Sequence, residues 1–152
     1  MQLRNIFLLL ALCASSVLAD FWIFYEGMSD EVAGYRFLHR EDPECHEIAQ
    51  ADHWPFWTDD VSKETGVRLF DRGEQNPRKP GGMEVNTGRV HFTLYESRNW
   101  GIFDLDDRPH GHCYSRLDTR PRKWNCPMDQ WKGKEGQLIF YCASDYDVTH
   151  FN

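Results

Sequence analysis

The chain has 152 residues, 24 of them acidic and 17 basic, which gives a formal net charge of −7. This length excludes a machine built from several large domains, and the negative charge argues against a protein that wraps nucleic acid, because phosphate groups would repel it. Aromatic residues make up 14% of the chain, whereas disordered acidic segments are poor in them, so we expect a folded domain.

Residues 1–19 have the pattern of a secretory signal peptide. Arg4 provides a positive charge, an apolar run follows it, and Val17 and Ala19 are the small residues of a cleavage site. The apolar run has about 13 residues, which is shorter than the roughly 20 that span a bilayer, and no later segment approaches that length. We therefore expect residues 20–152 to form one secreted domain, without a membrane span, in an oxidising compartment.

Two strands and a short helix are predicted in the first part of this domain. Residues 21–25, Phe-Trp-Ile-Phe-Tyr, have the composition of a strand that is buried on both faces, and residues 32–39 are the second strand. Asp42 and Pro43 form a helix-start signal with Asp42 as the N-cap. The helix would extend through about Ala51.

Residues 53–57, His-Trp-Pro-Phe-Trp, are predicted to form an aromatic turn that ends this helix. Two interpretations of its rings stay open. Trp54, Phe56 and Trp57 could form a platform on which sugar rings stack, or they could pack under the helix into an aromatic-rich core.

The second part of the domain is predicted to consist mostly of strands. Residues 73–82 form a polar loop, and residues 89–96 show the clearest alternation, with Val90, Phe92 and Leu94 on one face. Short strands separated by turn signals predict a mainly β fold: a small antiparallel sandwich or barrel with one short helix, linked by disulfides. The strands predicted in this part are residues 66–71, 89–96, 100–105, 112–117 and 137–143.

Four cysteines follow the signal peptide: Cys45, Cys113, Cys126 and Cys142. An even number of cysteines in a small secreted domain predicts two disulfides, for which three pairings exist. Spacing does not choose among them, and we favour Cys45–Cys113 with Cys126–Cys142, the second of which closes a short loop. None of the spacings is C-x-x-C, so neither a zinc ribbon nor a redox motif is supported.

Catalysis has no supporting nucleophile, phosphate-binding or cofactor motif, so we expect no cofactor and no enzymatic activity. An alternative is a small hydrolase of the ribonuclease type, which needs two acid–base groups and a cation at one phosphate. The candidates for these roles are His53, Glu84, Arg89 and His91. The other interpretation gives these histidines purely structural roles: His91 lies on the outward face of a strand, and His53 caps the aromatic turn.

One short segment suggests a metal ion, because His110 and His112 would point to the same side of an extended chain and Asp106 lies nearby. The same residues also fit a polar turn between strands, and we expect Cys113 to be oxidised. We therefore expect a turn and no metal, with His110, His112 and Asp106 as the candidate ligands if an ion binds.

Charge is distributed unevenly, and residues 116–134 carry a net charge of +4 within an acidic chain. A basic segment with interleaved tryptophans fits docking to an acidic partner, or it is a solvated loop that keeps the protein soluble. The candidate binding residues are Arg116, Arg120, Arg122, Lys123, Trp124, Trp131, Lys132 and Lys134.

Residues 20–25, 81–95 and 100–104, together with the leader, the four cysteines and the many aromatics, resemble the small cysteine-containing secreted proteins of filamentous fungi. This resemblance implies an effector-like protein that a fungus uses on or inside a host, and it assigns no functional residue. Four cysteines are few for a protein outside the cell, which leaves delivery into host cells open.

The leading hypothesis is a secreted, effector-like binding protein that promotes virulence by contact with a host protein or a cell-wall glycan. The alternatives are the small hydrolase and a secreted toxin or antimicrobial protein, although proteins of the last kind are often basic. We expect a monomer that binds no DNA. Two titratable groups and a cation that converge in one pocket would favour the hydrolase.

Overall fold

The computed structural model describes residues 19–27, 33–57, 59–70, 76–116, 118, 122–124 and 135–152, and residues 1–18 of the predicted signal peptide lie outside this part. The described strands are β1 (Ala19–Gly27), β2 (Gly34–Leu38), β3 (Trp54–Trp57), β4 (Gly66–Phe70), β5 (Gly82–Asn86), β6 (His91–Tyr95), β7 (Gly101–Asp104), β8 (Pro109–Ser115), β9 (Arg122–Lys123) and β10 (Glu135–Ser144). The helix α1 (Cys45–Gln50) and the 3-10 turns η1 (Glu96–Arg98) and η3 (Val148–His150) complete the elements. None of the helices in this part of the chain has the length and apolar character needed to cross a membrane.

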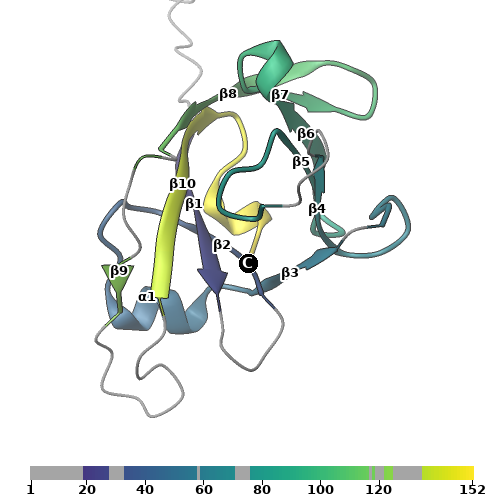
Figure 1. Ribbon diagram of the computed structural model, residues 1–152. Coiled ribbons are helices and arrows are strands. Elements are labelled where there is room, and N and C mark those ends of the chain that lie inside the picture. Colours follow the sequence, from purple (N-terminus) through teal and green to yellow (C-terminus); the bar gives the residue numbers. More distant parts are fainter. Residues whose placement is uncertain are drawn as a thin grey trace, which may run out of the picture.

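Nine of the described strands close into a barrel (Figure 1). The strands pair in chain order from β1 to β8, β8 pairs with β10, and β10 pairs with β1. The two-residue strand β9 pairs with the first residues of β10. Among the described strands, all pairs are antiparallel except β3–β4, which is parallel. The prediction of a mainly β fold with one short helix is confirmed, in its barrel form.

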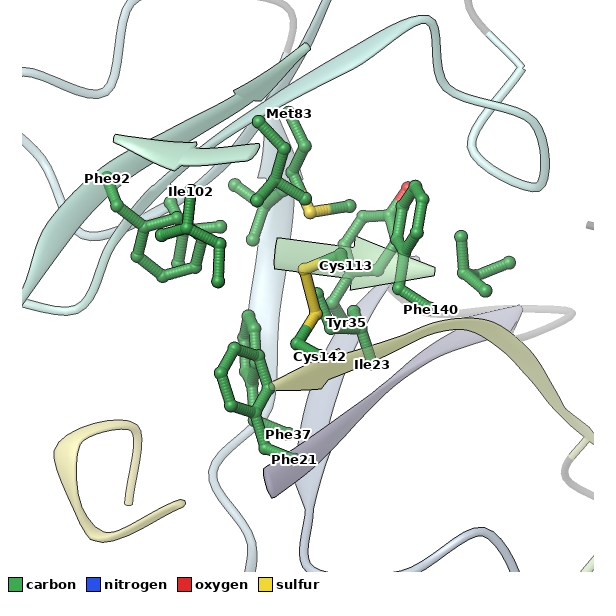
Figure 2. Close-up of a cluster of buried hydrophobic side chains, with 14 of the residues drawn as sticks. Phe21, Ile23, Tyr35, Phe37, Met83, Phe92, Ile102, Cys113, Phe140 and Cys142 are labelled. Atoms are coloured by element: carbon green, nitrogen blue, oxygen red, sulfur yellow. A yellow bond between two sulfur atoms is a disulfide. The ribbon is translucent and has the colours of Figure 1, made fainter. Parts of the chain in front are cut away.

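Aromatic rings fill the interior of the barrel (Figure 2). Alternate side chains of β1, including Phe21 and Ile23, belong to this core, as the two-residue period of a strand requires. The C-terminal segment turns back into the ring of strands in Figure 1, and the Phe151 ring centroid lies 4.7 Å from that of Phe21 and 4.4 Å from that of Phe37. These three rings are fully buried, so the described residues form a packed core inside the barrel.

Part of the other face of β1 is also buried, because α1 packs against it. Phe24 of β1 and Ile48 of α1 belong to a second core cluster. The remaining buried members of this second cluster are Leu38, Ala51, Trp124 and Leu138. Strand β1 therefore contacts apolar side chains on both faces, as its sequence predicts.

A buried ion pair fastens α1 to the barrel. Arg36 of β2 is 5% exposed, and its Nε lies 2.6 Å from Oε2 of Glu26, which is fully buried. The Nη1 atom of Arg36 donates to the carbonyl oxygens of Ile48 (3.1 Å) and Ala51. Both carbonyls lie at the C-terminal end of α1, where backbone oxygens lack partners within the helix.

Element boundaries differ from the predictions in two respects. All seven predicted strands overlap observed ones, but β3, β5 and β9 were not predicted. The helix begins at Cys45 with Glu44 as the N-cap, so the prediction of Asp42 as the cap is wrong. The Glu47 carboxylate accepts the backbone N–H of Glu44 (2.7 Å), and this reciprocal capping sets the helix start.

The favoured disulfide pairing is wrong. Cys113 and Cys142 lie directly opposite each other in β8 and β10 and are bonded, with their Cα atoms 4.0 Å apart. Cys45 is disulfide-bonded as well, whereas Cys126 lies outside the described residues. A preference for short loops failed here because strand register, rather than distance along the chain, places two cysteines side by side.

Candidate functional site

Two of the predicted acid–base residues meet on the outer face of β5 and β6. Val85 and Phe92 belong to the barrel core, so the alternation of each strand places Glu84 and His91 on the opposite face. The Oε1 atom of Glu84 lies 2.8 Å from Nε2 of His91. Both side chains are largely covered, with 7% of Glu84 and 15% of His91 exposed.

Arg68 of β4 is the cation beside this pair, a role for which Arg89 was the candidate. Arg68 lies opposite Glu84 in the register of β4 and β5, and its Nη1 is 3.5 Å from Oε2 of Glu84. Alternation within the predicted strand 66–71 is a signal that puts Arg68 on an outer face. The contact itself depends on a register that the sequence does not reveal.

The other two hydrolase candidates lie elsewhere. The Nη1 atom of Arg89 donates to the carbonyl oxygens of Thr149 (3.0 Å) and Asn152, so Arg89 holds the C-terminal segment. His53 lies against Gly34 at the start of β2, where a Cβ atom on residue 34 would clash with the imidazole. The structure therefore brings two of the four candidates together.

Glu84, His91 and Arg68, which we call the Glu84 cluster, provide an acid, a base and a cation. No gap separates Glu84 from His91. Ser62 Oγ is 3.5 Å from Glu84 Oε1, and Asp60 Oδ1 is 3.9 Å from Arg68 Nη1. Hydrogen bonds from Ser62 hold the pKa of Asp60 below its usual value, and the charges of Arg68 and His91 lower it further. In a mechanism of the ribonuclease type both the acid and the base must reach the substrate, whereas Glu84 and His91 contact each other at 2.8 Å.

A second polar cluster consists of His110 of β8 and the carboxylates of Asp104 and Asp145. The Nε2 atom of His110 lies 3.1 Å from Oδ2 of Asp104, and Nδ1 lies 3.1 Å from both carboxylate oxygens of Asp145. An imidazole that donates at both nitrogens is in its protonated form. Partial burial alone would lower the pKa of His110, but the hydrogen bonds and charges of Asp104 and Asp145 outweigh burial and raise it.

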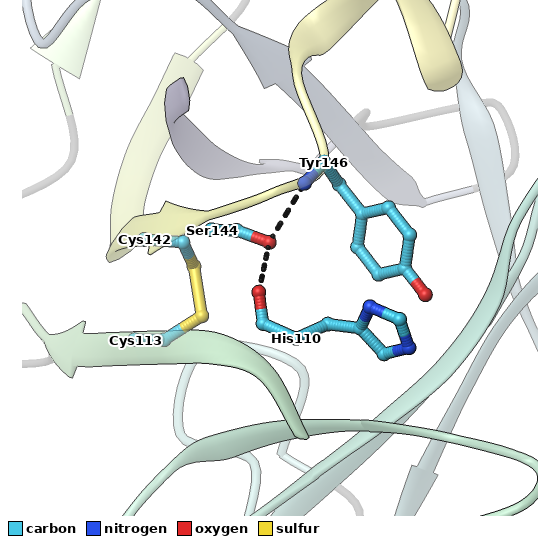
Figure 3. Close-up of a disulfide and its surroundings, with 5 residues drawn as sticks. All are labelled: His110, Cys113, Cys142, Ser144 and Tyr146. Carbon is cyan, nitrogen blue, oxygen red and sulfur yellow. Dashed lines mark hydrogen bonds between the residues drawn. A yellow bond between two sulfur atoms is a disulfide. The ribbon is translucent and has the colours of Figure 1, made fainter. Parts of the chain in front are cut away.

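Tyr146 connects this cluster to the barrel core. Its ring stacks on His110 at 4.8 Å and on Phe92 at 5.7 Å between centroids. Ser144 Oγ donates to the carbonyl oxygen of His110 (2.8 Å) and accepts the N–H of Tyr146 (3.0 Å), as Figure 3 shows. Burial first, and then the nearby carboxylates, raise the pKa of Tyr146 to about 12. These contacts fasten the segment after β10 to β8.

The metal candidates have other partners. Asp104 Oδ1 accepts the N–H groups of Asp106 (2.9 Å) and Arg108 (2.8 Å) and so organises the turn after β7. Asp106 lies 3.3 Å from the Arg108 guanidinium, and His112 meets the edge of Tyr114 at 4.8 Å between centroids. Within the described ranges, no three His, Cys, Asp or Glu side chains are grouped so that they could hold a metal ion.

We expect His110 to make the stability of the protein fall with rising pH. A histidine whose pKa is raised by folding stabilises the folded state fully below its unfolded pKa of about 6.5, and this contribution is lost as the pH rises through the folded value. In His110→Asn, the fall in unfolding free energy between about pH 6 and 9 should therefore be shallower than in the wild type. Urea unfolding at a series of pH values measures this slope.

On the acid side of the same plot of unfolding free energy against pH, Asp104 makes the stability fall as the pH decreases. The N–H of Arg108, and then the hydrogen bond to His110, hold the pKa of Asp104 below its usual value, so its contribution to stability is lost as the pH falls.

His46→Asn is the matched control for His110→Asn, because the His46 side chain is 63% exposed. Equal slopes for His110→Asn and the wild type would contradict the assignment.

A cavity of about 250 Å³ lies between β2, α1 and η3. It is lined by Phe37, Leu38, His39, Glu47, Gln50, Ala51, Val148, Thr149 and Asn152. Sites that enclose a small molecule usually measure about 300–1,000 Å³, so this cavity is smaller than such sites, and we assign it no ligand.

The predicted basic binding segment lies only partly within the described residues. Arg116 is exposed just after β8. Trp124 is 7% exposed, and its ring packs on Phe24 with centroids 5.9 Å apart. Its indole also occupies the space beside Gly136. Trp124 is therefore a core residue and not an exposed ring that could dock a partner. Arg120, Trp131, Lys132 and Lys134 lie outside the described residues, as do the side chains of Arg122 and Lys123.

The aromatic sequence 53–57 contains strand β3 and is not a turn. Trp54 and Phe56 pack against the barrel core, and Trp54 Nε1 donates to the carbonyl oxygen of Phe151 (2.9 Å). Trp57 is 41% exposed. Two rings of this segment thus pack against the barrel core and not under α1, while Trp57 remains at the surface.

A row of three aromatic side chains, which local sequence patterns do not predict, crosses the outer face of β1, β10 and β8. Trp22 lies opposite Tyr141, and Tyr141 lies opposite Tyr114, in the strand registers. The ring centroids are 5.0 Å apart for Trp22–Tyr141 and 5.7 Å apart for Tyr141–Tyr114. Tyr114, at one end, is 51% exposed. We call these three residues the aromatic row.

No protein-family model, curated protein or solved structure matches the chain at a significant level. Its function is therefore inferred from the geometry of the described residues.

Proposed function

We propose that the chain is a secreted, effector-like protein that works by binding a component of a host or of a cell wall at its outer surface. The observation that carries this proposal is the aromatic row, three rings side by side on an outer sheet face with one end half exposed. Large aromatic side chains at a protein surface are typical of binding sites. The packed interior supports contact at the surface over transport of a ligand within the barrel.

Two features fit secretion. Residues 1–19 have the pattern of a signal peptide. Cys113 and Cys142 form a disulfide, and Cys45 is disulfide-bonded too. Disulfides form and persist in oxidising environments such as the secretory pathway and the outside of the cell.

The proposal is tested by expressing the full chain in a secretory host and purifying it from the medium. We expect the purified protein to sediment with at least one insoluble wall polymer, such as chitin, cellulose or β-glucan, or to label host cell surfaces when it carries a fluorophore. Absence of the protein from the medium, or a protein that binds neither polymers nor cells, would contradict the proposal.

The grouping of Glu84 and His91 with the Arg68 guanidinium makes a small hydrolase the second candidate, and the same preparation tests it. Incubation with RNA and with the wall polymers should release no soluble fragments from either. Cleavage that disappears in folded His91→Ala but persists in His53→Ala would favour the hydrolase, because His53 lies against Gly34 and outside the cluster.

A further inference from the structure

The aromatic row has hydrogen-bonding groups beside its rings. Asp20 is exposed and lies two residues before Trp22 in β1, on the same outer face as Trp22 and Tyr141. Burial, followed by the nearby Asp20 carboxylate, raises the pKa of Tyr141, so its phenol stays neutral. The imidazole of His112 meets the edge of Tyr114 at 4.8 Å. The row thus combines ring surface with a carboxylate, an imidazole and phenol groups.

The row is also held rigidly. The disulfide Cys113–Cys142 crosslinks β8 and β10 at the pair of residues next to Tyr114 and Tyr141. At the other end, Trp22 packs against the second core cluster. A surface that is ordered before binding loses less conformational entropy when a ligand arrives.

The size of the row indicates a small ligand. An aromatic side chain buries about 150–250 Å² when it is fully covered, and Trp22 and Tyr141 are already partly covered. The row therefore offers far less than the roughly 800 Å² that each partner contributes to a stable protein–protein interface. A ligand only a few monomer units long would cover the aromatic row.

Charge and chemistry select among small ligands. The net charge of the chain is −7, and the Asp20 carboxylate lies at the row, so a phosphate backbone would be repelled. A neutral sugar carries no such charge. Its C–H face packs on an aromatic ring, and its hydroxyl groups donate to a carboxylate and accept from a phenol.

We propose that the aromatic row binds a neutral oligosaccharide, with Tyr114 as the main stacking ring and Asp20 as an acceptor for sugar hydroxyl groups. This inference rests on the proposed function and specifies its ligand. The sugar chain lies across β8 and β10 and contacts Tyr114 and Tyr141 together.

Calorimetric titration of the full chain with neutral hexasaccharides of chitin, cellulose and β-1,3-glucan tests the inference. The wild type should bind at least one of them, and Tyr114→Ala should weaken that binding about tenfold because the stacking ring is lost. Tyr114→Phe should bind like the wild type, since it keeps the ring. Trp57→Ala is the matched control, an exposed ring on β3 whose loss should leave the affinity unchanged.

Each failure has a distinct meaning. If Tyr114→Ala, shown to be folded by circular dichroism, binds the sugar as well as the wild type does, the inference is wrong. The same holds if Trp57→Ala is the variant that loses binding, or if the wild type binds an RNA hexamer and no sugar. In these cases, sedimentation of the wild type with wall polymers or labelling of host cells would leave the proposed function standing. A wild type that binds nothing in either experiment overturns both.

Discussion

Replacing Arg36 with methionine is expected to lower the free energy of unfolding by about 3–5 kcal/mol, the usual cost of removing one partner of a buried ion pair. Arg36 is 5% exposed and lies 2.6 Å from the fully buried Glu26 carboxylate. The substitution leaves that carboxylate buried without its guanidinium. It also removes the donor to the Ile48 and Ala51 carbonyls at the end of α1.

Urea unfolding followed by tryptophan fluorescence measures this loss. Arg108→Met is the matched control, because Arg108 is 72% exposed in its pair with Asp106 and such surface pairs contribute about 0–1 kcal/mol. Adding Glu26→Gln to Arg36→Met should recover part of the stability, since the buried charge is then gone. A loss below about 1 kcal/mol for Arg36→Met would show that the pair is not buried as described.

Removing the Cys113–Cys142 disulfide is expected to lower the unfolding free energy by about 2–4 kcal/mol. The bond joins residues 29 positions apart, and both sulfur-bearing side chains are fully buried in the barrel core. Loss of the crosslink frees the unfolded chain, and a smaller side chain leaves a cavity in the core.

Two double variants separate these contributions. Cys113→Ala with Cys142→Ala removes both crosslink and volume, whereas Cys113→Val with Cys142→Ala restores part of the volume, so its smaller loss should come mainly from the missing crosslink. Both are compared with the oxidised wild type by urea unfolding. Stability equal to that of the wild type in either variant would contradict the expected role of the bond.

Local pattern predicted most of the strands. The alternation of Val90, Phe92 and Leu94 identifies β6, because a strand with one buried face repeats every two residues. Strand β5 was missed because glycine at positions 81 and 82 reads as loop. Closure into a barrel, in place of a sandwich, could not be predicted because it depends on β1 pairing with β10.

The candidate sites were less predictable than the strands. Glu84 and His91 meet because β5 and β6 form a hairpin, so a local pattern contains part of this contact. The aromatic row joins Trp22, Tyr114 and Tyr141, which come from three strands that are distant in sequence. Only the order and register of the sheet bring them together. The basic neighbours of Trp124 in sequence predict a surface ring, whereas its packing on Phe24 buries it.

Pairing of β1 with β10 also governs when the protein can fold. Strand β10 leaves the ribosome after the other described strands, and until it arrives β1 and β8 each present an edge of unpaired N–H and C=O groups. Contacts between such distant segments close slowly compared with helical hairpins, and open strand edges favour aggregation in the meantime. A chain that ended before β10 would keep both edges and would also lack Phe151, the ring that packs on Phe21 and Phe37. The two edges therefore close only when β10 has been synthesised and pairs with β1 and β8.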